Sequence, residues 1–127
     1  MVMVQYSEHF SFIMENLSEK EQEILGSLTL YIEANGFEGL PGRNKSSNDF
    51  PRSFLGKKRM IEEDFVLKNK LWHYHVGYLC YRTINKRGDW TSDFVVHYQN
   101  LSEEEIRFVH YSSHKPVFRN PLPSYLT

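Results

Sequence analysis

Twelve residues in the middle of the chain, KLWHYHVGYLCY at 70–81, alternate with the period of a β-strand. One side of such a strand is bulky and apolar, with Trp72, Tyr74, Val76 and Tyr78. The other side carries His73 and His75, which strand geometry separates by about 7 Å. The alternation therefore predicts a central strand that buries its aromatic face and presents two imidazoles on the opposite face.

The composition predicts one domain over residues 1–127. Hydrophobic residues make up 40% of the chain, enough for a single core. The net charge of -1 gives no overall positive field for nucleic acid, so RNA binding would need a local patch. The single cysteine, Cys80, excludes an internal disulfide and a cysteine-rich zinc site. Without an apolar run of about 20 residues or a signal-peptide pattern, we expect a cytoplasmic protein with no membrane partner.

Two helices are expected after an opening strand in the first six residues. Ser7 can cap a helix whose apolar residues recur at helical spacing up to Leu17. Ser18 and Glu21 have the capping-box pattern of a second helix, which Asn35-Gly36 should end. Because the junction between the helices is so short, the sequence predicts a helical hairpin laid on a sheet.

The next two segments have weaker signals. Residues 37–53 are rich in Gly, Pro, Ser and Asn and predict a long surface loop. Arg43 and Lys45 in this loop offer cationic donors for phosphate, although a solvated connector is the simpler interpretation. Residues 54–69 fit either a strand or a helical turn, and we interpret 64–67 as a strand.

The C-terminal half predicts a meander of antiparallel strands. Residues 93–99 and 106–114 alternate again and are joined by a short turn. The proline-rich end should pack as an extended tail with four apolar anchors, Phe118, Leu122, Tyr125 and Leu126. The predicted fold class is α+β, with the two-helix hairpin packed on a mainly antiparallel sheet of four to five strands.

Four phrases, GLPGRNK, KLWHYHVGY, TSDFVVHYQ and IRFVHYSSHKP, together with this order of elements, resemble the RelE/ParE superfamily of toxins, in a divergent YafO- or HigB-like branch. The resemblance implies the toxin of a type II toxin-antitoxin system, with a cognate antitoxin as partner. It implies cleavage of mRNA on the ribosome by attack of the ribose 2′-hydroxyl, which uses acid-base groups and no metal or other cofactor.

The resemblance also suggests which residues act. Imidazole suits proton transfer because its unperturbed pKa is about 6.5. The candidate catalytic residues, with His114 as first choice, are His114, His97, His75, Tyr111 and Arg107. The candidates for binding substrate phosphate are Arg43, Lys45, Arg82 and His73. Arg107 and Tyr111 are expected on one face of the last strand.

Two alternatives remain open. ParE-like members inhibit DNA gyrase on much the same fold, so the fold alone does not choose between the nuclease and the alternative of a binding protein without chemistry, such as a gyrase-directed toxin. His73 and His75, with His97 or His110 from a neighbouring strand, are also compatible with a metal enzyme. The nearly neutral charge departs from the strongly basic character common among ribosome-cutting toxins.

Overall fold

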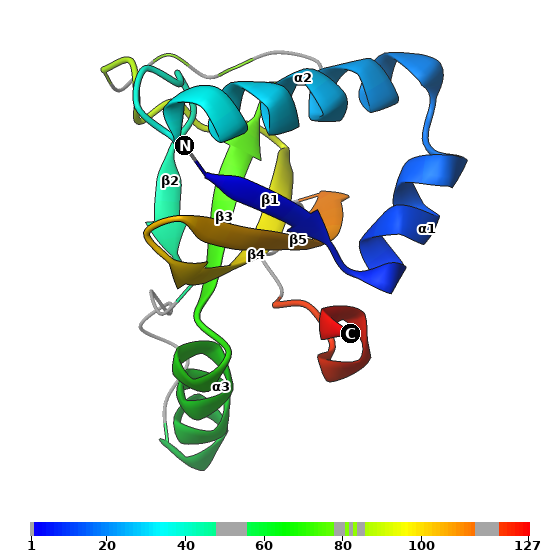
Figure 1. The fold of residues 1–127 in the computed structure, drawn as a ribbon. Helices are drawn as coiled ribbons and strands as arrows, with labels where there is room; N and C mark the ends of the chain where they lie inside the picture. Colours follow the sequence, from blue (N-terminus) through cyan, green and yellow to red (C-terminus); the bar gives the residue numbers. More distant parts are fainter. Residues whose placement is uncertain (1, 48–55, 78–80, 82, 84–85, 114–119) are drawn as a thin grey trace.

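Five strands and three α-helices form the described part of the protein in the computed structural model (Figure 1). The structure describes residues 2–47, 56–77, 81, 83, 86–113 and 120–127. The helices are α1 (Glu8–Asn16), α2 (Glu19–Asn35), α3 (Gly56–Lys68) and the short 3-10 helix η1 (Pro123–Leu126). The strands are β1 (Met3–Tyr6), β2 (Asn44–Ser46), β3 (Leu71–Val76), β4 (Phe94–Ser102) and β5 (Glu105–Ser113).

The strands lie in the order β1-β5-β4-β3-β2. β1 runs parallel to β5, and the other neighbouring pairs are antiparallel. The α+β class, the early strand and the antiparallel meander are therefore confirmed. Among the described residues, no helix combines the length and apolar character needed to cross a membrane.

The starts of α1 and α2 follow the predicted caps. The Ser7 hydroxyl accepts the Phe10 amide hydrogen at 3.1 Å, and the Ser18 hydroxyl accepts that of Glu21 at 3.2 Å. The Ser18 hydroxyl in turn donates to the Glu21 carboxylate, so the two residues of the cap are joined by two hydrogen bonds. α2 ends at Asn35 and is capped by Gly36, whose positive φ of 67° suits glycine.

The predicted helical hairpin is wrong in its geometry. In Figure 1, α2 runs along the top of the sheet and α1 runs down one side, so the helices meet at a corner. Leu17 and Ser18 between them are both extended, with ψ of 163° and 155°. Two extended residues turn the chain outward, and each helix packs on the sheet instead of on the other helix.

The main core lies between these helices and one face of the sheet. The helices contribute Phe10, Leu25, Leu28 and Ile32. The sheet contributes Tyr74, Val76, Val96, Tyr98, Ile106, Phe108 and Tyr111. The aromatic side of the central strand is thus buried, as the alternation predicts, and its histidines lie on the other face.

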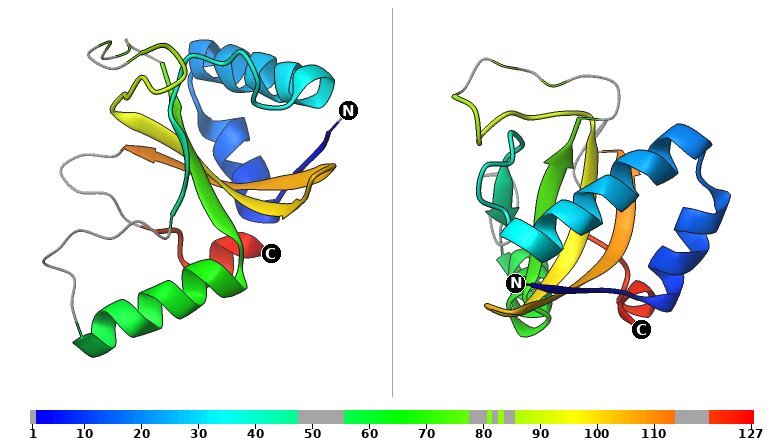
Figure 2. Two further views of the ribbon diagram at one scale, coloured as in Figure 1. Left: turned by 90° about the vertical axis from the view of Figure 1, so that its left-hand side faces the viewer. Right: turned by 45° about the horizontal axis from the view of Figure 1, so that its top comes forward.

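That other face is covered in part by α3 and by the C-terminal segment (Figure 2). A second cluster joins Val66 of α3 to Leu71 and Val109 of the sheet, with Leu126 packed against it. The strand predicted at 64–67 is wrong, because these residues belong to α3. The loop predicted at 37–53 is wrong in part, because β2 lies inside it.

The chain end combines an extended approach with the η1 turn. Tyr125 and Leu126 are half-buried anchors, whereas Leu122 is 56% exposed. Phe118, predicted as an anchor, lies outside the described residues, as does Tyr78 of the predicted central strand.

A β-bulge changes the face that β5 presents near its end. His97 pairs with His110, but the next residue, Tyr98, pairs with Phe108, so Val109 is the extra residue. The bulge keeps His110 on the face of His97, so the residue after it, Tyr111, points toward the helices and joins the main core. The prediction that Arg107 and Tyr111 share a face is therefore wrong.

Candidate functional site

Two cations and two imidazoles are cross-strand neighbours in the sheet. Lys45 of β2 pairs with His73 of β3. One step along, the amide of His75 donates to the carbonyl of Arg43 at 2.9 Å. Because directly paired residues point to the same side of a sheet, Lys45 and His73 lie on the face opposite α1 and α2. Arg43 precedes Lys45 by two residues and His75 follows His73 by two, so the alternation of side chains places them on the same face. With His97, which pairs with His73, we call these four side chains the histidine face.

The histidine face has a cationic rim and a buried floor. The Arg43 side chain is 31% exposed, and Lys45 is half-buried. By contrast, His73 is 6% exposed, His75 is 4% exposed and His97 is fully buried. The two cations are therefore more accessible to solvent than the three imidazoles.

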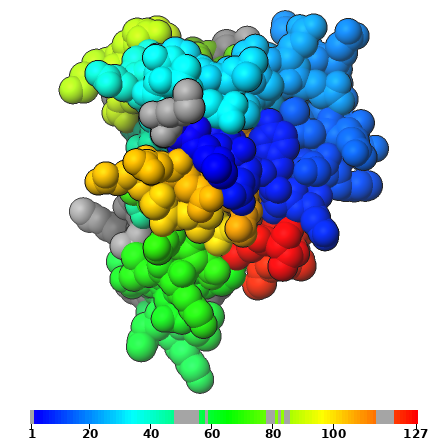
Figure 3. Space-filling model, viewed as in Figure 1, coloured from blue at the N-terminus to red at the C-terminus, as the bar shows by residue number. Residues whose placement is uncertain are grey.

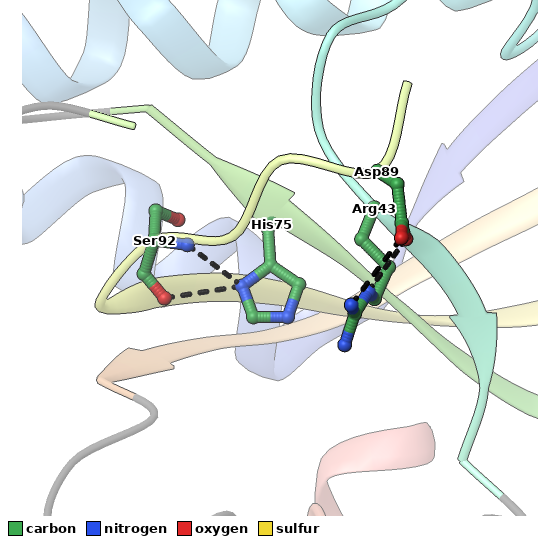
Figure 4. Close-up of polar contacts among 4 residues, drawn as sticks. All are labelled: Arg43, His75, Asp89 and Ser92. Atoms are coloured by element: carbon green, nitrogen blue, oxygen red, sulfur yellow. Dashed lines mark hydrogen bonds and ion pairs between the residues drawn. The ribbon is translucent and has the colours of Figure 1, made fainter. Parts of the chain in front are cut away.

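A turn before β4 fixes the ring of His75. The amide nitrogen and the carbonyl oxygen of Ser92 each lie 3.1 Å from Nδ1 of His75 (Figure 4). Since a backbone amide always donates, the neutral ring accepts at Nδ1 and carries its hydrogen on Nε2. If Nδ1 carries the hydrogen instead, the carbonyl oxygen is placed to accept a hydrogen bond from it. The Ser92 backbone thus offers a partner to Nδ1 in either tautomer.

The serine side chain holds this turn in position. Ser92 is buried, and its hydroxyl lies 2.7 Å from the carbonyl of Val76 and 2.9 Å from that of Phe94. One hydroxyl hydrogen serves both acceptors in turn or as a shared bond. The contacts tie the end of β3 to the start of β4, which keeps the Ser92 backbone beside the imidazole.

The other two imidazoles also have serine partners. Nδ1 of His73 lies 3.0 Å from the buried Ser47 hydroxyl, and Nε2 of His97 lies 3.2 Å from the Ser112 hydroxyl. The ring of His73 lies 5.8 Å from that of His75 and 6.2 Å from that of His97, measured between ring centres. Hydroxyl partners orient these rings because a hydroxyl both donates and accepts.

An ion pair holds the Arg43 side chain at the rim. Nε donates to one carboxylate oxygen of Asp89 at 2.7 Å, and an Nη donates to the other at 3.4 Å (Figure 4). The hydrogen bond from Arg43 lowers the pKa of Asp89 below its usual value. Asp89 is 43% exposed, so the pair is accessible to a competing anion such as phosphate.

Gly42 makes the approach of this loop to β3 possible. A Cβ on Gly42 would collide with the carbonyl oxygen of His75 and lie 2.8 Å from the Tyr74 ring. The Gly42 amide also donates to the Tyr74 hydroxyl at 3.0 Å. The residue before Arg43 must therefore be small for Arg43 to pair with His75.

The remaining predicted site residues are distributed elsewhere. The Tyr111 hydroxyl donates to the carboxylate of Glu21 at 3.0 Å, on the helix-covered side of the sheet. Arg107 pairs with Gln99 on the face of His97 and donates to the Gln99 side chain and to the carbonyl of Leu126. His114 and Arg82 lie outside the described residues.

A second histidine cluster was not predicted. Nε2 of His9 lies 3.0 Å from Nδ1 of His110, and the ring of Tyr125 stacks on both imidazoles. Burial, together with the nearby His9, lowers the pKa of His110 to about 4. Burial also lowers the pKa of His9. The cluster joins α1, β5 and η1, which are far apart in sequence. No local sequence pattern therefore predicts that these three side chains meet.

Ser47, Ser92, Ser112 and Asp89 also escaped prediction, because their roles depend on tertiary contacts. Within the described part of the chain, no group of three or more His, Cys, Asp or Glu side chains is arranged to hold a metal ion. Comparison with protein-family models, with curated proteins and with solved structures gave no match. The site must therefore be interpreted from its own chemistry.

Proposed function

We propose that this chain is the toxin of a type II toxin-antitoxin system and that it cleaves mRNA on the ribosome. The observation that carries the proposal is the pairing of Lys45 with His73, together with the backbone hydrogen bond from His75 to Arg43 beside it. Cations beside paired imidazoles are the groups that phosphodiester cleavage by a 2′-hydroxyl requires. The family resemblance of the sequence supports the same reaction.

The roles follow from the environment of each ring. His73, oriented by Ser47, accepts the proton of the 2′-hydroxyl as its oxygen attacks the adjacent phosphorus. His75 in its protonated form, oriented by Ser92, gives a proton to the leaving 5′-oxygen. The products are a 2′,3′-cyclic phosphate and a free 5′-hydroxyl, so the proton count balances. His97 is fully buried, so we assign it no contact with the substrate. Its proposed role is to pack beside its strand partner His73 and hold that ring in position.

Arg43 and Lys45 neutralise the phosphate as charge develops on it. They form a local cationic patch at the rim in a chain whose net charge is -1. A nearly neutral chain can bind RNA only through a local group of positive side chains, and Arg43 and Lys45 form such a group. A cognate antitoxin would inhibit the toxin by covering the same rim with a helix or an extended segment.

The test is cleavage of mRNA by purified protein, with and without ribosomes and with a chelator. We expect ribosome-dependent cleavage that ignores the chelator and falls at least about a hundredfold in His73→Ala and in His75→Ala. Arg43→Ala should lose activity mainly through weaker substrate binding. Arg59→Ala, a cation of α3 in an exposed i,i+4 pair, is the matched control and should retain activity.

Other outcomes would redirect the assignment. Cleavage abolished by the chelator would point to a histidine-ligated metal enzyme. Absence of cleavage under every condition would refute the nuclease and favour a binding function such as gyrase inhibition. His114→Ala belongs in the same series, because the resemblance makes that residue the first catalytic candidate.

A further inference from the structure

α3 packs on the rest of the described structure through few residues, since Val66 is the only buried one among its described side chains. Figure 3 shows it as a spur below the body, and Figure 1 shows it attached at the start of β3. Of the seven large apolar side chains that are exposed among the described residues, three lie on this helix. They are Met60, Ile61 and Leu67, which are 70%, 61% and 54% exposed.

These apolar residues share one face of α3. Residues 57, 60, 61, 64, 67 and 68 follow the spacing of three and four that aligns side chains along a helix, and all are exposed. The opposite side attaches the helix to the body through buried Val66 and half-buried Phe65. The outer face is thus an apolar stripe with charges inside it, the pattern of a helix surface that packs against another helix.

The positions of Lys57 and Asp64 along the stripe indicate which partner fits it, namely a second copy of this chain. Lys57 precedes Met60 by three residues, and Asp64 follows Ile61 by three residues. When a second α3 lies antiparallel, with the two-fold axis between Met60 and Ile61, Met60 faces Ile61 of the copy. The same operation places Lys57 opposite Asp64 of the copy, twice by symmetry. A parallel arrangement would instead place each charge opposite its own kind.

We propose that the outer face of α3 mediates two-fold, antiparallel self-association of this chain. The helix has 13 residues, hence a length of about 20 Å. A contact between two single helices of this length is smaller than a standard stable interface, so the dimer is weak and forms at about 10 to 500 μM. The inference does not depend on the proposed nuclease activity.

Charge exchange gives a decisive test, measured by sedimentation of the purified chain across that concentration range. Lys57→Glu alone and Asp64→Lys alone each convert two attractive pairs into repulsive ones, and each should weaken association about tenfold. The double variant restores opposite charges and should return Kd to about the wild-type value. Leu30→Ser, which alters an exposed apolar residue of α2, is the matched control and should leave association unchanged.

Two results would overturn the proposal. One is a wild-type protein that stays monomeric up to about 500 μM, which would leave the stripe to a different protein. The other is association that both single variants weaken but the double variant does not restore, which would exclude the antiparallel register. All the altered residues are exposed, and circular dichroism at each step confirms that the variants are folded.

Discussion

The His9–His110 pair should make the stability of this protein depend on pH in a defined direction. Burial holds the pKa of His110 at about 4, whereas an imidazole in the unfolded chain titrates near 6.5. The folded state therefore resists a proton that the unfolded state accepts. The stabilisation is fully present above pH 6.5 and is lost as the pH falls toward 4.

The size of the effect follows from the two pKa values. Between pH 7 and pH 5, a shift from 6.5 to about 4 changes the free energy of unfolding by about 2 kcal/mol. The His110 ring is partly exposed, so solvent screening reduces the expected loss to about 1 to 2 kcal/mol. For a chain of this size, that corresponds to a fall in Tm of several degrees, about 3 to 8 °C.

The assay is urea unfolding of wild type and His110→Gln at pH 7, 6 and 5. Glutamine keeps a polar group near His9 but cannot titrate, so the variant should lose the extra dependence on pH. The carboxylates titrate equally in both proteins and cancel in the difference. Equal changes in the free energy of unfolding for both proteins would refute the assigned origin of the pH dependence.

Four further substitutions test other parts of the structure. Gly42→Ala should destabilise the fold by about 1 to 3 kcal/mol in urea unfolding, because its Cβ collides with His75, whereas Gly26→Ala, with open space around it, should stabilise α2 by about 0.5 to 1 kcal/mol. Tyr111→Phe should cost about 1 kcal/mol through the lost bond to α2 yet leave mRNA cleavage intact, and a large loss of cleavage would restore the tyrosine to the catalytic set. Ser18→Ala should lower the free energy of unfolding by about 1 kcal/mol, and an unchanged value would show that this cap contributes nothing.

Local chemistry made some elements predictable from sequence. The alternation around His73 reports its environment directly, because every second residue of a strand points the same way. Ser7 and Ser18 announce helix starts because their hydroxyls serve amides three residues on. In such elements the signal and the structure depend on the same few neighbouring residues.

Other elements gave no such signal. β2 has three polar residues, Asn44–Ser46, so no alternation of apolar side chains marks it. α3 buries Val66 on one side and exposes Met60 and Ile61 on another, so its apolar residues do not form a single stripe. The exposed charged residues of α3 can be assigned to the outer side of a helix only once the tertiary contacts of Val66 are known.

The bulge at Val109 shows why site residues are harder to predict than strands. The sequence of β5 alternates regularly, yet one extra residue there places His110 beside His97 and sends Tyr111 to the opposite face. Among the described residues, the side chains near Arg43 and Lys45 on that face therefore include imidazoles and not the Tyr111 hydroxyl. A pattern of period two cannot reveal this change.

The same bulge connects the proposed chemistry to stability. It brings His110 into the cluster with His9 and Tyr125 on the face that carries His73 and His75. If the proposed cleavage falls in acid, two causes are to be distinguished: protonation of a proposed catalytic imidazole, and weakening of the contacts among α1, β5 and η1. Measuring cleavage by His110→Gln distinguishes these two causes. The variant keeps the proposed catalytic imidazoles His73 and His75 but lacks the titrating imidazole of His110. If the pH profile of cleavage is the same in wild type and His110→Gln, the acid limb belongs to the histidine face; if the variant keeps its activity to lower pH, the limb belongs to the fold.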